Sequence, residues 1–335
     1  MKAVVMRAVG PPEVLRYEDV PTPEPGPAEV LVKVHAVSVN RTLDLAVRAG
    51  TYARKVPLPH VLGNDPTGVI AAVGAGVTSH KVGDHVACGF YGIGTAPRPL
   101  MPGIDSWGGY AEYIKIPADG AVPIPRELDF PTATVIARHA PMAFCQLKDY
   151  GKLKVGDWVL VMGAAGGLGN IAVQVAKLLG AKVIAAAGAD ERVKQGIAAG
   201  ADAGINYRTQ DLTGEARRIT DGRGVDVVLE NIGDPTTFPK AFRSLARGGR
   251  LVTAGAHGGG QVTIDVSFLY LNQITIAGGT LGQSAYYKDA MEAAAAGKLK
   301  ANIECILPLS KAVDGHHLVG ERKVTGKVLL DPTQG

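Results

Sequence analysis

The residues best suited to chemistry in this sequence form one short stretch, Gly163 to Gly169. They read GAAGGLG and lie between an apolar run, WVLVM, and a helix-like run, NIAVQVAKLLG. A glycine-rich turn between a strand and a helix lets backbone N–H groups approach a pyrophosphate beside the positive end of the helix. Gly166 and Gly169 fill the second and third glycine positions of the GxGxxG pattern. Ala164 fills the first, a tight-turn position that alanine can take if its φ is negative. The stretch therefore predicts a dinucleotide-binding turn.

The end of the next strand-like run indicates which dinucleotide is held. An NAD site places a carboxylate there to accept a hydrogen bond from the ribose 2′-OH, but KVIAAAG ends in Ala187 and Gly188. Asp190 follows two or three positions later and is better explained as the first turn of the next helix. Guanidinium groups bind phosphate through charge-assisted pairs, so nearby basic residues favour a 2′-phosphate. These residues are Arg192, Lys194 and Arg208. The sequence predicts NADP rather than NAD.

The elements around this turn change character along the chain. From Met1 to about Pro125, short strand-like runs alternate with Gly/Pro clusters, which indicates a closed β barrel or a rolled sheet. After Pro131, strands alternate with helices of about 10–15 residues, which is typical of βαβ crossovers and a doubly wound parallel sheet. A tail from about Ser284 is expected to return and complete the first domain. The predicted α/β architecture has domains at 1–125 and 126–283, with a C-terminal return at 284–335.

Bulk properties exclude several functional classes. The 335 residues exceed the roughly 250–300 at which one core stops growing, so two domains are expected. The formal charge of +4 is spread along the chain, which predicts no nucleic-acid or membrane partner. No segment resembles a signal peptide or a membrane span. Three widely spaced cysteines argue against a disulfide framework and a structural zinc site, and favour a reducing cytoplasm: Cys88, Cys145 and Cys305.

Motifs along nearly the whole chain resemble the medium-chain dehydrogenase/reductase superfamily. In chain order they are LGNDPTGVIAAVG, KVGDHV, GGYAEYIKIP, AAGGLG, INYR, GRLVTAG and GKVLL. Within the superfamily, the chain is most similar to the zinc-independent quinone oxidoreductase and enone reductase branch. The resemblance implies a GroES-like β-barrel-type catalytic domain, a Rossmann domain and a homodimer.

Zinc alcohol dehydrogenases of this superfamily bind their catalytic metal at positions that carry other residues here. The early cysteine position falls at Asn40 or Arg41, and the GHE segment reads Gly63, Asn64, Asp65. Zinc prefers thiolate, imidazole or carboxylate ligands, so asparagine and arginine do not suit it. The stretch that corresponds to the four-cysteine lobe, GFYGIGTAPRPLMPGIDSWGG, contains no cysteine. No metal site is predicted. Three histidines leave a metal site open as an alternative: His60, His85 and His139.

The resemblance also implies particular site residues. Tyr52, in RAGTYARKVP, matches the tyrosine of the quinone reductase segment RSGLYP and is expected to donate to the acceptor carbonyl or to act as a gate. Asn40 resembles the asparagine that lies near the nicotinamide. The positions that match the pyrophosphate turn and the loops beside the nicotinamide ribose are Gly166, Gly167, Leu168, Asn231, Gly233, Ala254, Gly255 and Ala256. Those around the adenosine 2′-phosphate are Gly188, Arg192, Tyr207 and Arg322, with Tyr207 as the adenine-side wall.

The predicted reaction is hydride transfer from NADPH, without zinc, to a quinone or to the β-carbon of an α,β-unsaturated carbonyl compound. The loop from Phe90 to Gly109, with Tyr91, Met101 and Trp107, is expected to shape the acceptor pocket. The segment ITIAGGTLG resembles an edge strand that pairs across a two-fold axis, which predicts a homodimer through Ile274–Gly279.

Two other hypotheses stay open at the level of sequence. One is a dinucleotide-binding protein of the same fold with little turnover, in a structural, regulatory or RNA-binding role. The other is an atypical zinc-dependent alcohol dehydrogenase. The sequence does not identify the acceptor.

Overall fold

The structure, a computed structural model, describes residues 1–93, 95–279, 284–322 and 324–334. The chain divides into two compact units. The first unit holds Met1–Arg138 together with Ala301–Gly335, and the second holds His139–Lys300. The C-terminal residues therefore return to the N-terminal unit, as the sequence predicts.

Antiparallel pairing dominates the first unit, whose described strands form two sheets. The smaller sheet has the order β2-β1-β4, with β1 (Lys2–Met6), β2 (Leu15–Asp19) and β4 (His60–Val61). The larger sheet has the order β15-β16-β3-β5-β6-β8, and β7 also pairs with β3. Its strands are β3 (Glu29–Ser38), β5 (Thr67–Val73), β6 (His85–Cys88), β7 (Tyr113–Pro117), β8 (Ala121–Pro123), β15 (Ile303–Pro308) and β16 (Lys327–Asp331). The tail completes this sheet because β16 pairs with β3.

Helices are few and mostly short in this unit. They are α1 (Asp44–Arg48), α9 (Ala312–Gly320) and the first part of α2 (Phe130–Cys145), with 3₁₀ segments η1 (Pro12–Val14), η2 (Ala118–Gly120) and η4 (Leu309–Lys311).

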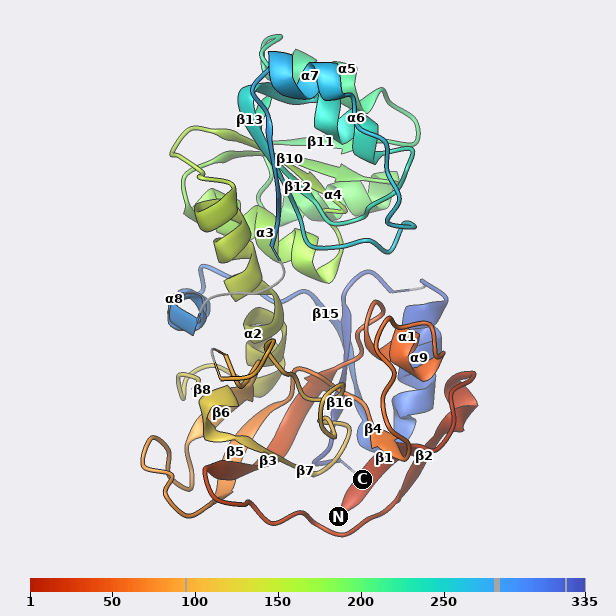
Figure 1. The fold of residues 1–335 in the computed structure, drawn as a ribbon, viewed down its shortest axis with the longest axis vertical. Helices are drawn as coiled ribbons and strands as arrows, with labels where there is room; N and C mark the ends of the chain where they lie inside the picture. Colours follow the sequence, from red (N-terminus) through yellow and green to blue (C-terminus); the bar gives the residue numbers. More distant parts are fainter. Residues whose placement is uncertain (94, 280–283, 323, 335) are drawn as a thin grey trace. The chain divides into compact units, whose positions relative to one another are not determined.

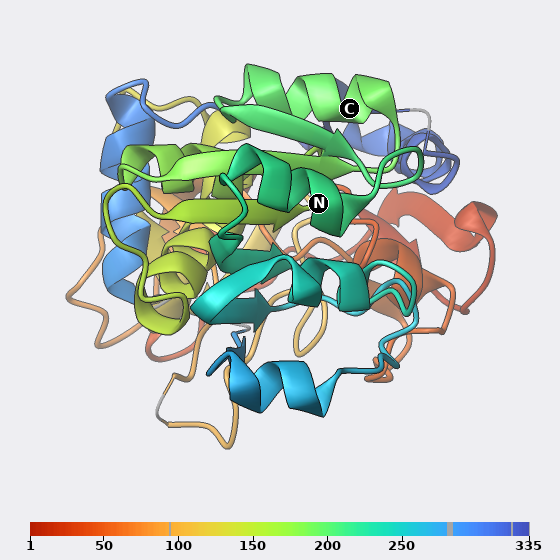
Figure 2. The same ribbon diagram turned by 90° about the horizontal axis from the view of Figure 1, so that it is seen from above.

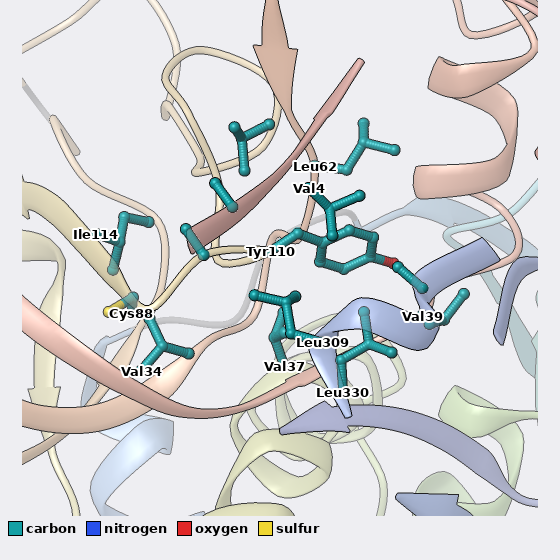
Figure 3. Packing of buried hydrophobic residues seen from close by; sticks show 14 of the residues in the cluster. Val4, Val34, Val37, Val39, Leu62, Cys88, Tyr110, Ile114, Leu309 and Leu330 are labelled. Atoms are coloured by element: carbon teal, nitrogen blue, oxygen red, sulfur yellow. The ribbon is translucent and has the colours of Figure 1, made fainter. Parts of the chain in front are cut away.

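The core of the first unit surrounds an aromatic ring. Tyr110 is fully buried, and Figure 3 shows its ring among apolar side chains from several strands. Val37 from β3, Leu309 from η4 and Leu330 from β16 belong to the same cluster. Because these residues come from both ends of the chain, the core requires the returning tail.

The second unit is a parallel sheet with strand order β11-β10-β9-β12-β13-β14. Every neighbouring pair is parallel. The strands are β9 (Trp158–Met162), β10 (Lys182–Ala187), β11 (Ala203–Asn206), β12 (Val225–Glu230), β13 (Leu245–Thr253) and β14 (Thr275–Gly278). Numbered from β9, this is the 3-2-1-4-5-6 order of a dinucleotide-binding sheet, so the predicted doubly wound fold is confirmed.

Helices cover both faces of this sheet. Figure 1 shows α5, α6 and α7 on one side of the strands and α3 and α4 on the other, and Figure 2 views the sheet through the first group. The helices are α3 (Gly167–Leu178), α4 (Asp190–Ala198), α5 (Leu212–Ile219), α6 (Phe238–Arg243), α7 (Val266–Leu271) and α8 (Ser284–Ala295), with the π-helical turn η3 (Gln146–Tyr150) after α2. The inner strands β9, β10 and β12 are buried along nearly their whole length, as expected where both faces of a sheet are covered.

The predicted domain boundaries, at 125/126 and 283/284, lie earlier in the chain than the observed ones. Thr134 in α2 bonds Thr67 at 2.7 Å, so the first part of this helix belongs with the first unit. Tyr286 in α8 donates to Asp149 at 2.7 Å and stacks on Phe144, so α8 belongs with the second. The sequence pattern marks where one kind of element replaces another, whereas these boundaries depend on which partner each helix contacts.

Within the described part of the chain, no helix is long and apolar enough to cross a lipid bilayer.

Candidate functional site

The glycine-rich turn joins β9 to α3 in the second unit. Gly163 takes the left-handed conformation, with φ of 68°, whereas Ala164 is not among the residues with positive φ. The alanine is therefore compatible with the turn, as predicted. Gly166 is the N-cap of α3, and the first bond along the helix runs from Asn170 N to Gly166 O at 2.8 Å. The N–H groups of the three residues between them precede the helical ladder and are available to an anion.

Two glycines after this cap lie where a side chain would collide. A Cβ on Gly169 would lie 2.2 Å from the carbonyl oxygen of Gly163, so the helix packs directly on the turn. A Cβ on Gly167 would lie 2.7 Å from Nε2 of His139 in α2. Gly169, the third glycine of the pattern, is therefore needed for packing of α3 on the turn, and the backbone at the N-cap, Gly166, stays exposed.

The loops that follow β12 and β13 lie beside each other at the same edge of the sheet. A Cβ on Gly255 would lie 2.2 Å from the Asn231 carbonyl oxygen, and one on Gly233 would lie 2.8 Å from Cα of Ala256. Ile232 lies 3.7 Å from a Cβ built on Gly163, which brings these loops to the glycine-rich turn. Carboxyl ends of parallel strands, on either side of the point where the strand order reverses, form the usual ligand crevice of such sheets. Ala254 directly follows β13 in this region.

Sequence reasoning missed two buried side chains in these loops. Glu230, the last residue of β12, accepts from Ile232 N at 3.1 Å and Gly233 N at 3.0 Å, and burial raises its pKa. Gln146 is fully buried and donates from Nε2 to Oδ1 of Asn231 at 3.2 Å. Within the described residues, Nδ2 of Asn231 is buried without a hydrogen-bond partner. A polar residue within the apolar run APMAFCQL is the signal that could have identified Gln146.

The end of β10 carries the groups predicted to select the dinucleotide. Gly188 follows β10, and a Cβ there would lie 3.0 Å from the ring of Tyr207, which follows β11. Asp190 begins α4, as predicted, and one oxygen accepts from Nδ2 of Asn206 at 2.6 Å. Arg192 lies on the first turn of α4 and is half-buried. The structure therefore brings Gly188, Tyr207 and the start of α4 together.

Arg322 belongs to the first unit, where it follows α9. It is exposed and takes the left-handed conformation, with φ of 56°. Its contribution to a 2′-phosphate site stays a prediction.

A buried polar cluster centred on Asn40 occupies the first unit. The Asn40 amide nitrogen lies 2.8 Å from Oδ1 of Asn64, 3.0 Å from Oδ2 of Asp65 and 3.1 Å from Oγ of Ser38. Its amide oxygen accepts from Nζ of Lys327 at 2.5 Å. Asp65 also accepts from Ser38 N at 2.9 Å and Ser38 Oγ at 2.5 Å. We call this set, Ser38, Asn40, Asn64, Asp65 and Lys327, the Asn40 cluster.

A second carboxyl group ties the two loops of the Asn40 cluster together. Asp44 accepts from Asn40 N at 2.8 Å and from Gly63 N at 3.1 Å. Burial, followed by the nearby Asp65 carboxylate, raises the pKa of Asp44 to about 7. Asp44 therefore carries a proton part of the time near neutral pH and fixes the backbone geometry on both sides of the cluster.

Tyr52 has contacts other than those of the Asn40 cluster. It follows α1, and its ring packs on the apolar core of the first unit, with the Arg54 guanidinium 5.8 Å from the ring centroid. Across the described residues, no hydrogen bond joins Tyr52 to a member of the Asn40 cluster. Its predicted role as a carbonyl donor or gate receives no support from a contact and stays a prediction.

The loop predicted to shape the acceptor pocket lines a cavity of about 310 Å³ in the first unit. Tyr91 and Trp107 are in its wall, together with Tyr113 from β7. Met101 packs on the core cluster instead. No member of the Asn40 cluster lines this cavity.

The residues that resemble the superfamily's zinc-ligand positions have other contacts in this structure. Asn40 and Asn64 present amides to each other, and Arg41 is exposed. His60 contacts the carbonyl oxygen of Gly103 at 2.9 Å, and the ring of His85 lies 4.9 Å from that of Phe130. In the described ranges, no group of three or more His, Cys, Asp or Glu residues could hold a metal ion.

Comparison with known proteins relates both units to dehydrogenases. A family model described as "Alcohol dehydrogenase GroES-like domain" matches residues 26–126, and one described as "Zinc-binding dehydrogenase" matches residues 167–296. The quinone oxidoreductase of Homo sapiens is 32% identical to the chain, over 98% of this chain and 97% of the relative. The NAD-dependent alcohol dehydrogenase of Sulfolobus acidocaldarius is 31% identical, over 99% and 100%. A solved structure described as an NAD-dependent alcohol dehydrogenase is 39% identical, with a TM-score of 0.91 over 99% of both chains.

Proposed function

Because the chain belongs to the medium-chain dehydrogenase/reductase superfamily, we propose that it is a zinc-independent reductase that passes hydride from NADPH to a quinone or an α,β-unsaturated carbonyl compound. Family membership establishes an oxidoreductase with a dinucleotide-binding fold. Our proposal adds three points: the cofactor carries a 2′-phosphate, the acceptor is a quinone or an enone, and the reaction does not need zinc. The observation that carries it is the Asn40 cluster: Asn40 and Asn64, which resemble the superfamily's zinc-ligand positions, bond each other through their amides, and Lys327 donates to Asn40.

The second unit fits a dinucleotide. The exposed Gly166 cap and the free N–H groups at the start of α3 suit a pyrophosphate. The buried Nδ2 of Asn231 has a hydrogen to donate and no partner in the described chain, so a ligand that accepts there would remove a costly unsatisfied group. The missing side chain at Gly188 makes room for the Tyr207 ring, which is our proposed wall beside the adenine.

The protein's part in the reaction is to hold and orient. When bound, the reduced nicotinamide supplies the hydride. Gly167, Leu168 and Gly169 would hold the pyrophosphate through their N–H groups, and Asn231, held by Gln146, would orient the nicotinamide half. The Asn40 cluster would place a positive group toward the carbonyl oxygen of the acceptor, where negative charge grows.

A second candidate function is zinc-dependent alcohol oxidation with NAD. Two similar proteins, at 31% and 39% identity, carry the name NAD-dependent alcohol dehydrogenase. The donor set of the Asn40 cluster opposes this function, since it offers zinc a single carboxylate, Asp65, among amides and an ammonium group.

One assay separates these functions. NADPH oxidation by metal-stripped protein is measured with a 1,4-quinone and an enone offered separately, and with NADH as the control. Turnover with NADPH supports the proposal. Activity only with NAD and an alcohol, after zinc is restored, supports the second candidate. Nucleotide binding without turnover would instead support the binding-protein hypothesis.

The preference for NADPH is expected to depend on arginines after β10 and β11. We expect Arg192→Ala and Arg208→Ala to raise the KM for NADPH by about 10–100-fold each and to leave that for NADH unchanged, because hydrogen bonds to a charged phosphate contribute about 1.5–3 kcal/mol. Arg218→Ala is the matched control, since Arg218 is an exposed arginine of α5 that pairs with Glu215 at 2.8 Å. An unchanged ratio of NADPH to NADH activity in both arginine variants would contradict the assignment.

We also propose a homodimer through the edge of the parallel sheet. β14 is last in the strand order, and the predicted interface, Ile274–Gly279, lies in the described chain, whereas the rest of ITIAGGTLG lies outside it. Beside it, α7 exposes Val266, Tyr270 and Leu271. We expect Tyr270→Glu combined with Ile276→Lys to convert a dimer into a monomer, measured by light scattering after gel filtration. Val155→Glu, at an exposed valine elsewhere in this unit, should leave the dimer intact. A monomeric wild-type protein would refute the proposal.

The three cysteines are free thiols, which suits the cytoplasmic location that we propose.

A further inference from the structure

The side chain of Asn40 has no hydrogen left for a substrate. An amide nitrogen has two hydrogens, and that of Asn40 already faces three acceptors, on Ser38, Asn64 and Asp65, within 3.1 Å. Its amide oxygen accepts from Lys327. A donor to the carbonyl oxygen of an acceptor must therefore come from another member of the Asn40 cluster.

Lys327 is the member of the cluster whose ammonium group has further N–H groups that can donate. An ammonium group has three hydrogens, and within the described chain Lys327 Nζ makes one hydrogen bond, to Asn40 Oδ1. The residue is only partly buried, in contrast to the buried asparagines and aspartates around it. It can therefore donate to a bound molecule without leaving Asn40.

The sheet holds Lys327 in place. It opens β16, which pairs antiparallel with β3 so that Leu329 lies opposite Ser38. The Val39 N–H donates to the Val328 carbonyl oxygen at 2.9 Å, directly beside Asn40. A donor on a strand in the middle of a sheet is well positioned for chemistry because its backbone does not move with the loops.

The charges around Lys327 suit a proton donor. Burial lowers its pKa, and the Arg138 guanidinium acts in the same direction, while Asp65 and Asp44 act in the opposite direction. A lysine whose pKa is lowered toward the working pH gives up a proton more readily than an exposed one.

We propose that the Lys327 ammonium, and not the Asn40 amide, donates the hydrogen bond to the carbonyl oxygen of the acceptor and gives that oxygen its proton. Lys327 is in this scheme the acid of the reaction, and Asn40 is the residue that positions it. The inference rests on the proposed function.

Protons and electrons balance for both classes of acceptor. In an enone, the hydride and its two electrons form a C–H bond at the β-carbon, and the π electrons move to the carbonyl oxygen. One N–H bond of Lys327 breaks and one O–H bond forms, which gives an enol that water converts to the saturated ketone. In a quinone, the hydride and its two electrons form an O–H bond at one carbonyl oxygen, and the ring π electrons move to the other oxygen, which gives the hydroquinone anion; the proton from Lys327 then forms the second O–H bond. The nicotinamide is oxidised, the acceptor is reduced, and neutral Lys327 regains a proton from water.

Steady-state kinetics of Lys327→Met and Lys327→Arg test the proposal, with Lys33→Met, an exposed lysine of β3, as the control. We expect Lys327→Met to lower kcat by about 10²–10⁴-fold with unchanged NADPH affinity, which is the usual contribution of a positioned acid. In the wild type, kcat should fall at high pH with an apparent pKa below 10.5. Lys327→Arg keeps the hydrogen bond but not an acid that titrates in this range, so the high-pH decrease should disappear. A kcat within threefold of wild type in Lys327→Met, with the same high-pH decrease, overturns the proposal.

A binding experiment tests Lys327 without turnover and so separates its failure from that of the proposed function. 4-Nitrophenol, whose phenolate absorbs visible light, is titrated in the presence of NADP⁺ as a probe for the oxyanion. We expect the bound phenol to have a pKa at least one unit lower on the wild type and on Lys33→Met than on Lys327→Met. Equal pKa values on all three proteins, or no binding, overturn the proposal. If the wild type oxidises NADPH with none of the acceptors, the proposed function is refuted. The pKa shift of bound 4-nitrophenol still tests the role of Lys327 in that case.

Discussion

Replacing Gly169 with alanine is expected to destabilise the second unit by about 3 kcal/mol and to abolish nucleotide binding. The new Cβ would lie 2.2 Å from the carbonyl oxygen of Gly163, which is backbone and cannot rotate away. Either α3 must move off the turn or the turn must open, and overpacking of this kind costs about 1–3 kcal/mol even where side chains can adjust. The same movement would redirect the N–H groups that we propose hold the pyrophosphate.

Gly166→Ala is the informative partner of this substitution. At Gly166 the nearest atom to a Cβ is the Gly163 oxygen at 3.3 Å, and φ is −75°, so alanine can adopt the backbone conformation. The methyl group would instead point into the space that a phosphate approaches. We expect the free energy of unfolding to stay within about 0.5 kcal/mol of wild type and NADPH binding to weaken about 10–100-fold.

Urea unfolding and fluorescence titration with NADPH measure both effects. Wild type and Gly166→Ala serve as the references for Gly169→Ala, because alanine fits the backbone conformation at Gly166. Equal stability of the Gly169 and Gly166 variants would show that α3 does not pack on the turn as described. Full NADPH affinity in both variants would remove the glycine-rich turn from the nucleotide site.

Stability is expected to depend on pH through two buried groups with opposite signs. Asp44 has a pKa of about 7, raised chiefly by burial, and His316 has a pKa of about 3, lowered chiefly by burial and then by Arg48. As pH rises from 4 to 6.5, the free energy of unfolding of Asp44→Asn should increase by about 3 kcal/mol, because only the His316 slope remains. Over the same rise, that of His316→Gln should decrease by about as much, because only the Asp44 slope remains.

The signs follow from which state binds the proton more tightly. For Asp44 the folded pKa lies above the unfolded value of 3.8, so its contribution is complete below about pH 4 and is lost as pH rises toward 7. For His316 the folded pKa lies below the unfolded value of 6.5, so its contribution is complete above about pH 6.5 and is lost as pH falls toward 3. In the wild type the two slopes oppose each other, and each substitution reveals the other group's slope.

Urea denaturation at several pH values between 4 and 7 measures these slopes. The slope is more informative than the absolute stability, since Asp44→Asn also removes an acceptor from either Asn40 N or Gly63 N at every pH. His316→Gln keeps polar atoms for Arg48 and for the hydroxyl of Tyr110, which lie 3.4 Å and 3.2 Å from the His316 ring nitrogens. Parallel pH profiles for all three proteins would contradict the assigned shifts.

Local patterns were sufficient for the second unit. Strand and helix periodicity predicted a parallel, doubly wound sheet, and the observed order β11-β10-β9-β12-β13-β14 confirms it. The glycine-rich turn was found because its chemistry is contained in seven consecutive residues, and Asp190 begins a helix as predicted. The resemblance to the superfamily assigned Asn231, Gly233 and Gly255 to neighbouring loops, and the structure brings these loops together.

The sequence by itself determined the class of fold and the position of the glycine-rich turn, and through its resemblance to the superfamily it led to the prediction that Asn40 and Asn64 replace zinc ligands. Only the tertiary structure decided that Lys327 contacts Asn40, across 287 positions of sequence, that Gln146 holds Asn231, and that Asp44 joins two loops. The reason is physical: a turn or a helix start is built from neighbours in the chain, whereas these contacts exist because β16 pairs with β3 in one particular register. Shifting that register by one residue would turn Lys327 to the opposite face of the sheet, and no local pattern records which register forms.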